Sequence, residues 1–328
     1  MYSNINHWVE TIIDSENKPI LPILTYPGLQ LTGKTINEMT YSAEVHFQCI
    51  KTIAERYPSM AAVLLSMDLS IEAEAFGTPV KFGEEDVPSV SDRLIFDYAE
   101  IEKLEIPEPD SKRITEYINA AELASKENFG KPVFAGTIGP FSLAGRLLDI
   151  TEIMTGILID PDNMHILLEK CTSFLLNYLK ALKNVGVNGV LMAEPAAGLL
   201  GAEQCDEFSS RYVEMIVDEI QDENFMVILH NCGETETLID SMVSTGAKGF
   251  HFGNAVNMMS ILPQVPADRL VFGNLDPVTL IKHGTPESIA VATKEMTNKT
   301  KAFKNFVLST GCDIPAATPL ENIDAMFF

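Results

Sequence analysis

Residues 225–252 read FMVILHNCGETETLIDSMVSTGAKGFHF, with two short apolar runs on either side of a longer amphipathic stretch. Apart from Lys248 and the two histidines, the hydrophobicity of the runs 225–230 and 248–252 is continuous rather than alternating, which is typical of strands covered on both faces, as in parallel sheets. The stretch between them, 234–244, has the spacing of an amphipathic helix. A strand, a helix and a second strand in this order predict a parallel β-α-β unit.

The same alternation continues in both directions along the chain. We expect strands at 19–26, 61–67, 132–137, 188–193, 225–230, 248–252, 269–274 and 305–310. Helical patterns lie at 37–57, 112–127, 162–184, 203–221, 234–244 and 286–303. Eight such units predict an α/β fold closed into a (β/α)8 TIM barrel, with residues 1–328 as a single domain. An open doubly wound sheet is the alternative, but the segment TYPGLQLTG after the first strand does not match the glycine-rich phosphate loop of such sheets.

Two additions to this barrel are expected. A short helix near 4–14 precedes the first strand, and an insertion at about 69–111 follows the second strand and covers the barrel mouth. Within the insertion, FGTPVKFGEEDVPSV predicts a hairpin or an extended excursion. The last residues, TPLENIDAMFF, read as the opening of a final helix.

Charge and cysteine content narrow the class of protein. The chain has 46 acidic and 23 basic residues and a net charge of −23, which opposes binding to nucleic acid or to an anionic membrane. No apolar run reaches the roughly 18 residues that a membrane span needs, and the N-terminus lacks the pattern of a signal peptide. Five scattered cysteines do not form a disulfide framework. We therefore expect a soluble, reduced, cytoplasmic protein.

Three residues at predicted strand ends have the chemistry of a metal site. His230 ends one strand and Cys232 follows two residues later, so both side chains project to the same side. Cys312 follows the last predicted strand, whose C-terminal end opens onto the same barrel mouth. One imidazole nitrogen and two thiolates suit zinc. The pattern predicts a zinc site formed by His230, Cys232 and Cys312.

The number of ligands indicates the chemistry. Three protein ligands leave a position open, as in catalytic rather than structural zinc sites. Two thiolates neutralise the charge of the ion and weaken its power to acidify water, whereas a substrate thiol held as thiolate remains nucleophilic. The set therefore favours alkyl transfer to sulfur over hydrolysis. The alternative is that His230 is a hydrogen-bonded core histidine and that both cysteines are small buried hydrophobes.

Other polar residues at strand ends are further candidates. Asp68 and Glu194 are candidate catalytic groups that relay a proton or occupy the open coordination position. Asn274 and Asp276, in GNLDP, can line the mouth and bind substrate, although an Asp-Pro pair is also an ordinary helix start. Glu72 and Glu74 are expected to lie on a solvated face, and His251, within a predicted strand, is expected to be a barrel-interior residue rather than a ligand.

Several segments together resemble a known family. They are MDLSIEAEAFGTPVKFGEEDVPSV (67–90), GTIGPFSLAG (136–145), ILHNCG (228–233), FGNLDP (272–277) and STGCDIPAATPLENI (309–323). In this order they resemble the uroporphyrinogen decarboxylase superfamily, specifically its zinc-dependent methylcobamide:coenzyme M methyltransferase branch. The resemblance covers nearly the whole chain.

The resemblance implies a reaction and its cofactors. In that branch the His-x-Cys pair and the late cysteine bind zinc, which activates the thiol of coenzyme M. The thiolate attacks the methyl group of a methylcobamide carried by a partner corrinoid protein, and cobalt(I) leaves. Since the acidic chain opposes the sulfonate of coenzyme M, Arg146 or backbone amides must bind it locally.

Three alternatives remain open. A metal-free decarboxylase fits less well, because TYPGLQLTG lacks the arginines that the decarboxylase branch carries there and Cys312 stands where that branch has histidine. The segment ENKPILPIL replaces the usual basic start of the methyltransferases, so a corrinoid methyltransferase with a tetrahydrofolate acceptor is a second alternative. The third is a non-catalytic module in which zinc only joins two strands.

Overall fold

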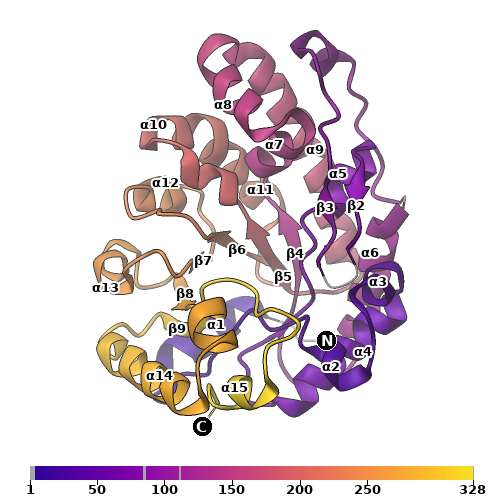
Figure 1. Ribbon diagram of the computed structural model, residues 1–328. Helices are drawn as coiled ribbons and strands as arrows, with labels where there is room; N and C mark the ends of the chain where they lie inside the picture. The colour runs from indigo at the N-terminus through magenta and orange to yellow at the C-terminus, as the bar shows by residue number, and fades with distance from the viewer. Residues whose placement is uncertain (1–3, 84–85, 111, 328) are drawn as a thin grey trace.

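A curled parallel β-sheet surrounded by helices forms the centre of the molecule (Figure 1). The computed structural model describes residues 4–83, 86–110 and 112–327. The sheet has seven strands in the order β1-β4-β5-β6-β7-β8-β9, and each neighbouring pair is parallel. The strands are β1 (Val63–Leu64), β4 (Val133–Ile138), β5 (Gly189–Ala193), β6 (Met226–Asn231), β7 (Gly249–Phe252), β8 (Leu270–Leu275) and β9 (Phe306–Thr310). They confirm six of the predicted strands closely and a seventh in part, because only two residues of 61–67 form a ladder.

The predicted first strand, 19–26, was wrong as a strand. Its residues form no ladder, because Pro19 and Pro22 have no N–H to donate. The segment nevertheless lies between the two edges of the sheet. The N–H of Leu21 donates to Leu308 O of β9 at 2.9 Å, and the N–H of Ala61, just before β1, donates to Ile20 O at 2.9 Å. The structure thus shows a curled seven-stranded sheet with an extended segment where the eighth strand was expected.

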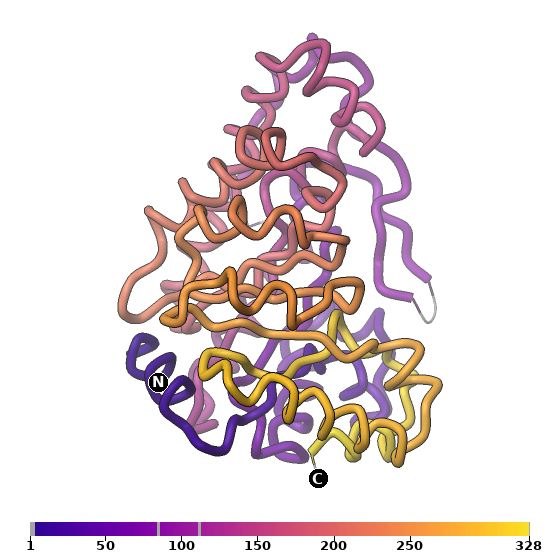
Figure 2. The backbone as a smooth tube through the Cα atoms, turned by 90° about the vertical axis from the view of Figure 1, so that its left-hand side faces the viewer, coloured from indigo at the N-terminus to yellow at the C-terminus, as the bar shows by residue number. Residues whose placement is uncertain are grey.

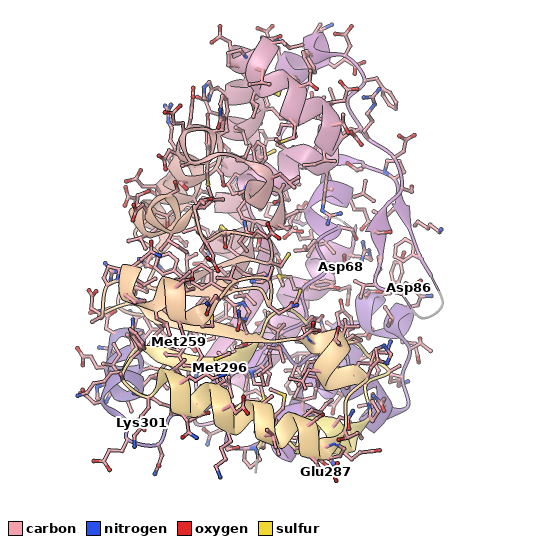
Figure 3. All side chains as sticks on the ribbon, turned by 60° about the vertical axis from the view of Figure 1, so that its left-hand side comes forward. Asp68, Asp86, Met259, Glu287, Met296 and Lys301 are labelled. Atoms are coloured by element: carbon pink, nitrogen blue, oxygen red, sulfur yellow. The ribbon has the colours of Figure 1, made fainter. Side chains whose placement is uncertain are left out.

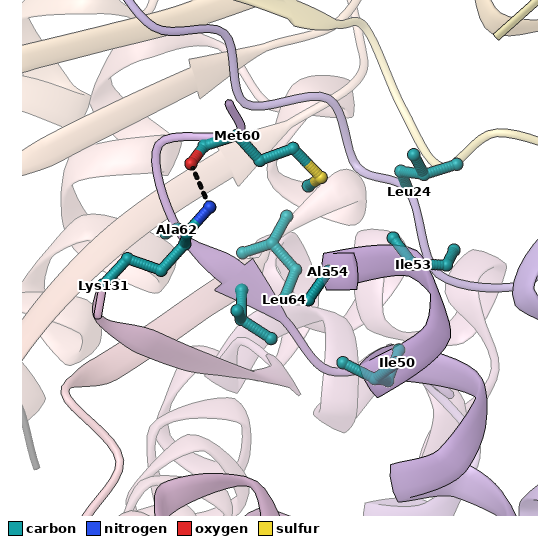
Figure 4. A pocket seen from close by; sticks show the side chains of 9 residues that line it. Leu24, Ile50, Ile53, Ala54, Met60, Ala62, Leu64 and Lys131 are labelled. Atoms are coloured by element: carbon teal, nitrogen blue, oxygen red, sulfur yellow. Dashed lines mark hydrogen bonds between the residues drawn. The ribbon is translucent and has the colours of Figure 1, made fainter. Parts of the chain in front are cut away.

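Apolar side chains hold this extended segment in place. Figure 4 shows Leu24 beside Ile50 and Ile53 of α4 and Leu64 of β1, around a small cavity of about 10 Å³. Lys131 borders the same cavity, and its ammonium group donates to Met60 O at 2.9 Å. The helix therefore covers the segment with apolar surface, which replaces part of the stabilisation that a ladder would give.

Helices cover the outside of the sheet, and most follow the predicted ranges. Two predicted helices are divided. The range 37–57 is two helices, because Ser42 begins the second by accepting a hydrogen bond from Val45 N, and 203–221 is interrupted by the π-helix Asp206–Ser210. The helices are α1 (Ile5–Asp14), α2 (Gly28–Thr32), α3 (Ile36–Tyr41), α4 (Ala43–Arg56), α5 (Ile71–Phe76), α6 (Lys112–Lys126), α7 (Pro140–Leu148), α8 (Ile150–Ile159), α9 (Pro161–Asn184), α10 (Ala202–Cys205), α11 (Arg211–Ile220), α12 (Ile239–Ser244), α13 (Met258–Ile261), α14 (Pro286–Thr300) and α15 (Leu320–Asp324). None of the helices in the described ranges combines the length and apolar character of a membrane-spanning segment.

The insertion after β1 contains the predicted hairpin. Helix α5 comes first, and then β2 (Val80–Lys81) pairs antiparallel with β3 (Ser89–Val90). A 3-10 helix, Tyr98–Lys103, completes it. Figure 2 shows the hairpin projecting from one side of the molecule. Residues 84–85 and 111 of the insertion lie outside the described residues.

Candidate functional site

The ends of β6 and β9 place two cysteines at the same end of the sheet. Cys232 follows β6 directly and is exposed, whereas Cys312 lies two residues after β9 and is half-buried. Burial, the carboxyl of Asp313 and the nearby Cys232 together raise the pKa of the Cys312 thiol to about 11. Cys232 and Cys312, 80 positions apart (312 − 232) in the sequence, therefore both lie at the mouth of the sheet.

A glycine loop packs against both thiol-bearing segments. A Cβ atom on Gly253 would lie 2.6 Å from the Cα of Cys232, and one on Gly311 would lie 2.4 Å from the backbone N of Asn254. These separations are shorter than any real Cβ contact, so the loop after β7 approaches both segments only because Gly253 and Gly311 have no side chain. The glycines set how closely the segments that carry the thiols meet.

The imidazole of His230 is oriented from one side. His230 is buried at the end of β6, and its Nδ1 lies 3.2 Å from the backbone O of His251 and 2.8 Å from the Nδ1 of the same residue. Burial lowers the pKa of His230 to about 4, so the ring is neutral at physiological pH. Within the described ranges, Nε2 of His230 has no hydrogen-bond partner. A neutral imidazole with one free nitrogen is the form that ligates metals.

The three donors are not gathered around a common point. Among the residues that the structure describes, no group of three or more His, Cys, Asp or Glu side chains is arranged to hold a metal ion. Their chemistry nevertheless fits zinc, since one neutral imidazole and two thiols supply the donor set of an open zinc site. The side chain of Cys232 is exposed, whereas that of His230 is buried and contacts His251.

Cys312 also lines a pocket. The pocket has a volume of about 390 Å³ and is walled by the chain after β9, the hairpin loop and the residues around β1. Arg146 of α7 lines the same pocket, and in the described part of the chain its guanidinium has no salt bridge or hydrogen bond. Burial lowers the pKa of Arg146 while the carboxyls of Glu72 and Asp68 raise it, and an arginine stays protonated in any case. The pocket therefore offers a thiol and a positive charge.

Asp68 is held in a buried ion pair below the hairpin. Its Oδ2 accepts from the guanidinium of Arg113, and its Oδ1 accepts from Ser70 N at 2.9 Å and from Ser70 Oγ at 2.6 Å. Arg113 is 2% exposed and also donates to Glu74 at 2.8 Å. The ring of Phe82, in the hairpin, lies 4.9 Å from the guanidinium. Figure 3 shows Asp68 near this hairpin, which carries Asp86 further out. The carboxylate of Asp68 is therefore committed to Arg113.

The expectation that Glu72 belongs to a solvated face was wrong. Glu72 is fully buried, because α5 turns this residue toward β4. Its Oε1 accepts hydrogen bonds from Thr137 Oγ1 at 3.1 Å and from Ile138 N at 3.0 Å, whereas Oε2 has no partner among the described residues. Burial raises the pKa of Glu72 to about 7.

Glu194 caps a helix. Its Oε1 accepts from Phe141 N at 2.7 Å, and its Oε2 accepts from Ser142 N at 2.9 Å and from the Ser142 hydroxyl. These amides lie in the first turn of α7, whose N-cap residue, Gly139, has no side chain to cap them. The carboxylate of Glu194, the residue after β5, accepts their hydrogen bonds instead. Burial raises the pKa of Glu194 to about 7. Both carboxylate oxygens are occupied, which ties β5 to the helix that carries Arg146.

The two residues of GNLDP shape loops at the mouth. The amide nitrogen of Asn274 donates to Gly253 O at 2.9 Å and to Val256 O at 2.6 Å, which fixes the glycine loop after β7. Asp276 accepts from two backbone N–H groups of the π-helix Pro277–Lys282, which begins directly after it. This is the helix-start role that the sequence also allowed. Neither residue lines the pocket beside Cys312.

Comparison with known proteins shows the family of the chain. The family model for uroporphyrinogen decarboxylase (URO-D) matches residues 20–327. The chain belongs to the uroporphyrinogen decarboxylase family. Among relatives of this URO-D family protein, a methylcobamide:CoM methyltransferase from Methanosarcina acetivorans is 31% identical, over 93% of this chain and 92% of the relative. A uroporphyrinogen decarboxylase from Actinobacillus pleuropneumoniae is 27% identical, over 83% and 79%.

A solved structure has the same fold. A methyltransferase from Methanosarcina mazei superposes with a TM-score of 0.84 at 19% identity, covering 99% of this chain and 97% of that one. The predicted resemblance to the family is thereby confirmed.

Several residues around the candidate site were not predicted from the sequence. Arg113 was not considered, because nothing in its local sequence marks it and its partner Asp68 is 45 positions away. Asp313, whose Oδ1 is buried without a partner in the described residues, was not among the predicted site residues. His251 was expected to be interior, and it is, but its contact with His230 was not foreseen. The alignment of two strands that each carry a histidine was the available signal.

Proposed function

We propose that this protein transfers a methyl group from a methylated corrinoid protein to the thiol of coenzyme M, which zinc holds at His230, Cys232 and Cys312. The observation that carries the proposal is the pocket shared by Cys312 and Arg146. Coenzyme M is a short molecule with a thiol at one end and a sulfonate at the other, so it needs a thiol site and a cation in one small cavity. The methylcobamide:CoM methyltransferase relative supports this choice of substrates.

The residues of this chain have separate tasks in the proposed reaction. His230 and the two cysteines hold zinc, which supplies a positive charge that keeps the substrate thiol ionised at neutral pH. Arg146 binds the sulfonate by charge-assisted hydrogen bonds. The thiolate sulfur forms a bond to the methyl carbon, the carbon–cobalt bond of the corrinoid breaks, and its electron pair stays on cobalt.

Asp68 and Glu194 support the site rather than react, in this proposal. Asp68, through Arg113, holds the hairpin whose residues Val87 and Pro88 wall the pocket. Glu194 fixes the start of the helix that carries Arg146. In this proposal residues 1–328 form a single domain, and the insertion at about 69–111 covers the mouth of the sheet.

The test uses methylcobalamin as methyl donor and coenzyme M as acceptor, and it follows the loss of the methyl–cobalt absorbance. We expect zinc-dependent demethylation in the purified protein. Cys312→Ser should lower the rate more than the 10–100-fold that loss of an outer-shell partner costs. Cys205→Ser changes a buried thiol away from the pocket and is the matched control. Equal rates in both variants, or no demethylation with zinc, would overturn the proposal.

Two related activities are distinct outcomes of the same test. Demethylation that requires tetrahydrofolate instead of a thiol would replace coenzyme M as the methyl acceptor and keep the corrinoid protein as the methyl donor. The uroporphyrinogen decarboxylase relative makes decarboxylation the other outcome to measure. Release of carbon dioxide from uroporphyrinogen, unchanged in Cys312→Ser, would replace methyl transfer as the function.

A further inference from the structure

Two buried histidines and a serine form a hydrogen-bonded chain inside the sheet. His230 of β6 and His251 of β7 are direct partners in the strand register. Their Nδ1 atoms lie 2.8 Å apart, and Nε2 of His251 lies 2.9 Å from the hydroxyl of Ser309 on β9. All three side chains are buried, with exposed fractions of 2%, 2% and 0%. The chain connects the strand that precedes Cys232 with the strand that precedes Cys312.

The hydrogen-bond partners assign the proton positions along this chain. Nδ1 of His230 contacts the backbone O of His251 at 3.2 Å, and a carbonyl oxygen only accepts. Nδ1 of His230 therefore carries its proton. The same N–H faces Nδ1 of His251, which must then be the acceptor. Since a neutral imidazole has a single N–H, the proton of His251 is on Nε2, from which it donates to Ser309.

This assignment leaves a lone pair on the other nitrogen of His230. With its proton on Nδ1, the ring presents an unprotonated Nε2, and within the described residues nothing else accepts or donates there. A metal-bound imidazole needs this arrangement, and a partner on its second nitrogen fixes the tautomer. We propose that His251 is a positioning residue that holds His230 in the Nδ1–H tautomer and aims its Nε2 at the zinc ion. The inference rests on the proposed function, since it names a support for the same site.

Packing alone does not require a histidine at position 251. The ring centroids of His230 and His251 lie 4.6 Å apart, edge to face at 79°, and the ring of Phe272 is stacked with that of His251 at 6.4 Å. A phenylalanine would fill this space and keep both ring contacts. What phenylalanine lacks is the nitrogen that accepts from His230 and the N–H that reaches Ser309. The side chain of His251 is thus explained by hydrogen bonding rather than by volume.

The experiment compares three variants of the full chain. His251→Phe keeps the ring and removes the acceptor, and His251→Asn returns an acceptor oxygen near the place of Nδ1. Ser309→Ala removes only the hydroxyl that Nε2 of His251 contacts. Two quantities are measured: the tautomer of His230, from two-bond proton–nitrogen NMR correlations in metal-free protein labelled at histidine, and zinc affinity, from competition with a chelator.

We expect His251→Phe to lose part of the Nδ1–H population and to bind zinc about tenfold more weakly. This is the lower end of the effect of outer-shell partners, because the backbone O of residue 251 remains as an acceptor. His251→Asn should recover most of both quantities, and Ser309→Ala should change them less than His251→Phe does. If His251→Phe fails to fold, two results test the same claim. Wild-type His230 should be in the Nδ1–H form, and Ser309→Ala and His251→Asn should both keep most of that form and of the zinc affinity.

The outcomes separate the inference from the proposed function. A His230 that keeps its tautomer and a zinc affinity that stays within about threefold in His251→Phe would overturn the inference, even if wild type binds zinc. A wild type that binds no zinc would overturn the metal site of the proposed function. In that case a tautomer change in His251→Phe would still support the positioning of His230, and its absence would overturn both.

Discussion

Replacing Arg113 by leucine is the sharpest test of the buried ion pair beneath the hairpin. The guanidinium is 2% exposed and contacts Asp68, Ser70 and Glu74, with Phe82 on its face. Leucine keeps part of the volume but leaves the carboxylate of Asp68, which is 0% exposed, without its counter-charge. Ser70 still donates two hydrogen bonds to that carboxylate.

The expected loss of stability follows from the burial of both charges. Breaking a buried ion pair by removing one partner costs about 3–5 kcal/mol, because an uncompensated charge stays inside. We expect Arg113→Leu to lower the free energy of unfolding by this amount. Adding Asp68→Asn removes the stranded charge, so the double variant should recover about 1–3 kcal/mol of the loss.

Urea unfolding followed by circular dichroism measures these values for wild type, both single variants and the double variant. Arg211→Leu, at an exposed position of α11, is the control and should stay within about 0.5 kcal/mol of wild type. The reasoning fails if Arg113→Leu costs less than about 1 kcal/mol or if the two substitutions are additive. Either result would mean that water already reaches the carboxylate of Asp68.

Three further predictions concern the pocket, the helix cap and the glycine loop. Arg146→Gln should raise the KM for coenzyme M about 10–150-fold, the worth of a hydrogen bond to a charged group, and leave the KM for 2-mercaptoethanol unchanged in the demethylation assay. The pKa of Glu194 lies at about 7, above its usual 4.5, so its contribution to stability is full below pH 4.5 and is lost as the pH rises through 7. The difference in unfolding free energy between wild type and Glu194→Gln should therefore fall by about 3 kcal/mol from pH 4.5 to about pH 8. Gly253→Ala should lower the unfolding free energy by about 1–3 kcal/mol, because its Cβ meets the backbone of Cys232 at 2.6 Å.

Each of these predictions has an outcome that contradicts it. An equal rise in KM for both thiols would show that Arg146 shapes the pocket without binding the sulfonate. A pH-independent difference for Glu194→Gln would mean that this carboxyl has the same pKa in the folded and unfolded states. For the glycine loop, Gly201→Ala is the control, because its Cβ meets only the flexible end of Gln204. Gly253→Ala should have a lower unfolding free energy than Gly201→Ala, and equal values for the two variants would contradict the prediction.

The strands could be predicted because parallel sheets bury both faces. Runs such as NGVLMA and FMVILH are apolar apart from one polar residue at an end, and β5 and most of β6 lie within them, entirely buried. The segment 19–26 has the same composition but contains Pro19 and Pro22, and the missing N–H groups prevent a ladder. The apolar composition therefore predicted the position of this segment beside the sheet, and the prolines explain why it forms no ladder there.

The candidate site was predictable only where residues follow strands directly. His230, Cys232 and Cys312 were named because a strand end fixes their place, whereas Glu72 was misplaced because a helix of six residues gives too little periodicity to assign a face. The pair of Arg113 and Asp68 depends on how the insertion packs, which no local pattern encodes. Long-range packing decides which polar residues are buried, and it becomes visible only in three dimensions.

The closure of the sheet has a consequence for biosynthesis. The segment after α1 bonds to β9, and the pair formed by Ile23 N and Thr310 Oγ1 spans 287 positions. The segment 19–26 is synthesised long before β9, so its edge that bonds to β9 stays open until synthesis is nearly finished. Such an edge pairs readily with other chains. Expression at lower temperature, or with chaperones that shield nascent strands, should therefore increase the yield of correctly closed protein.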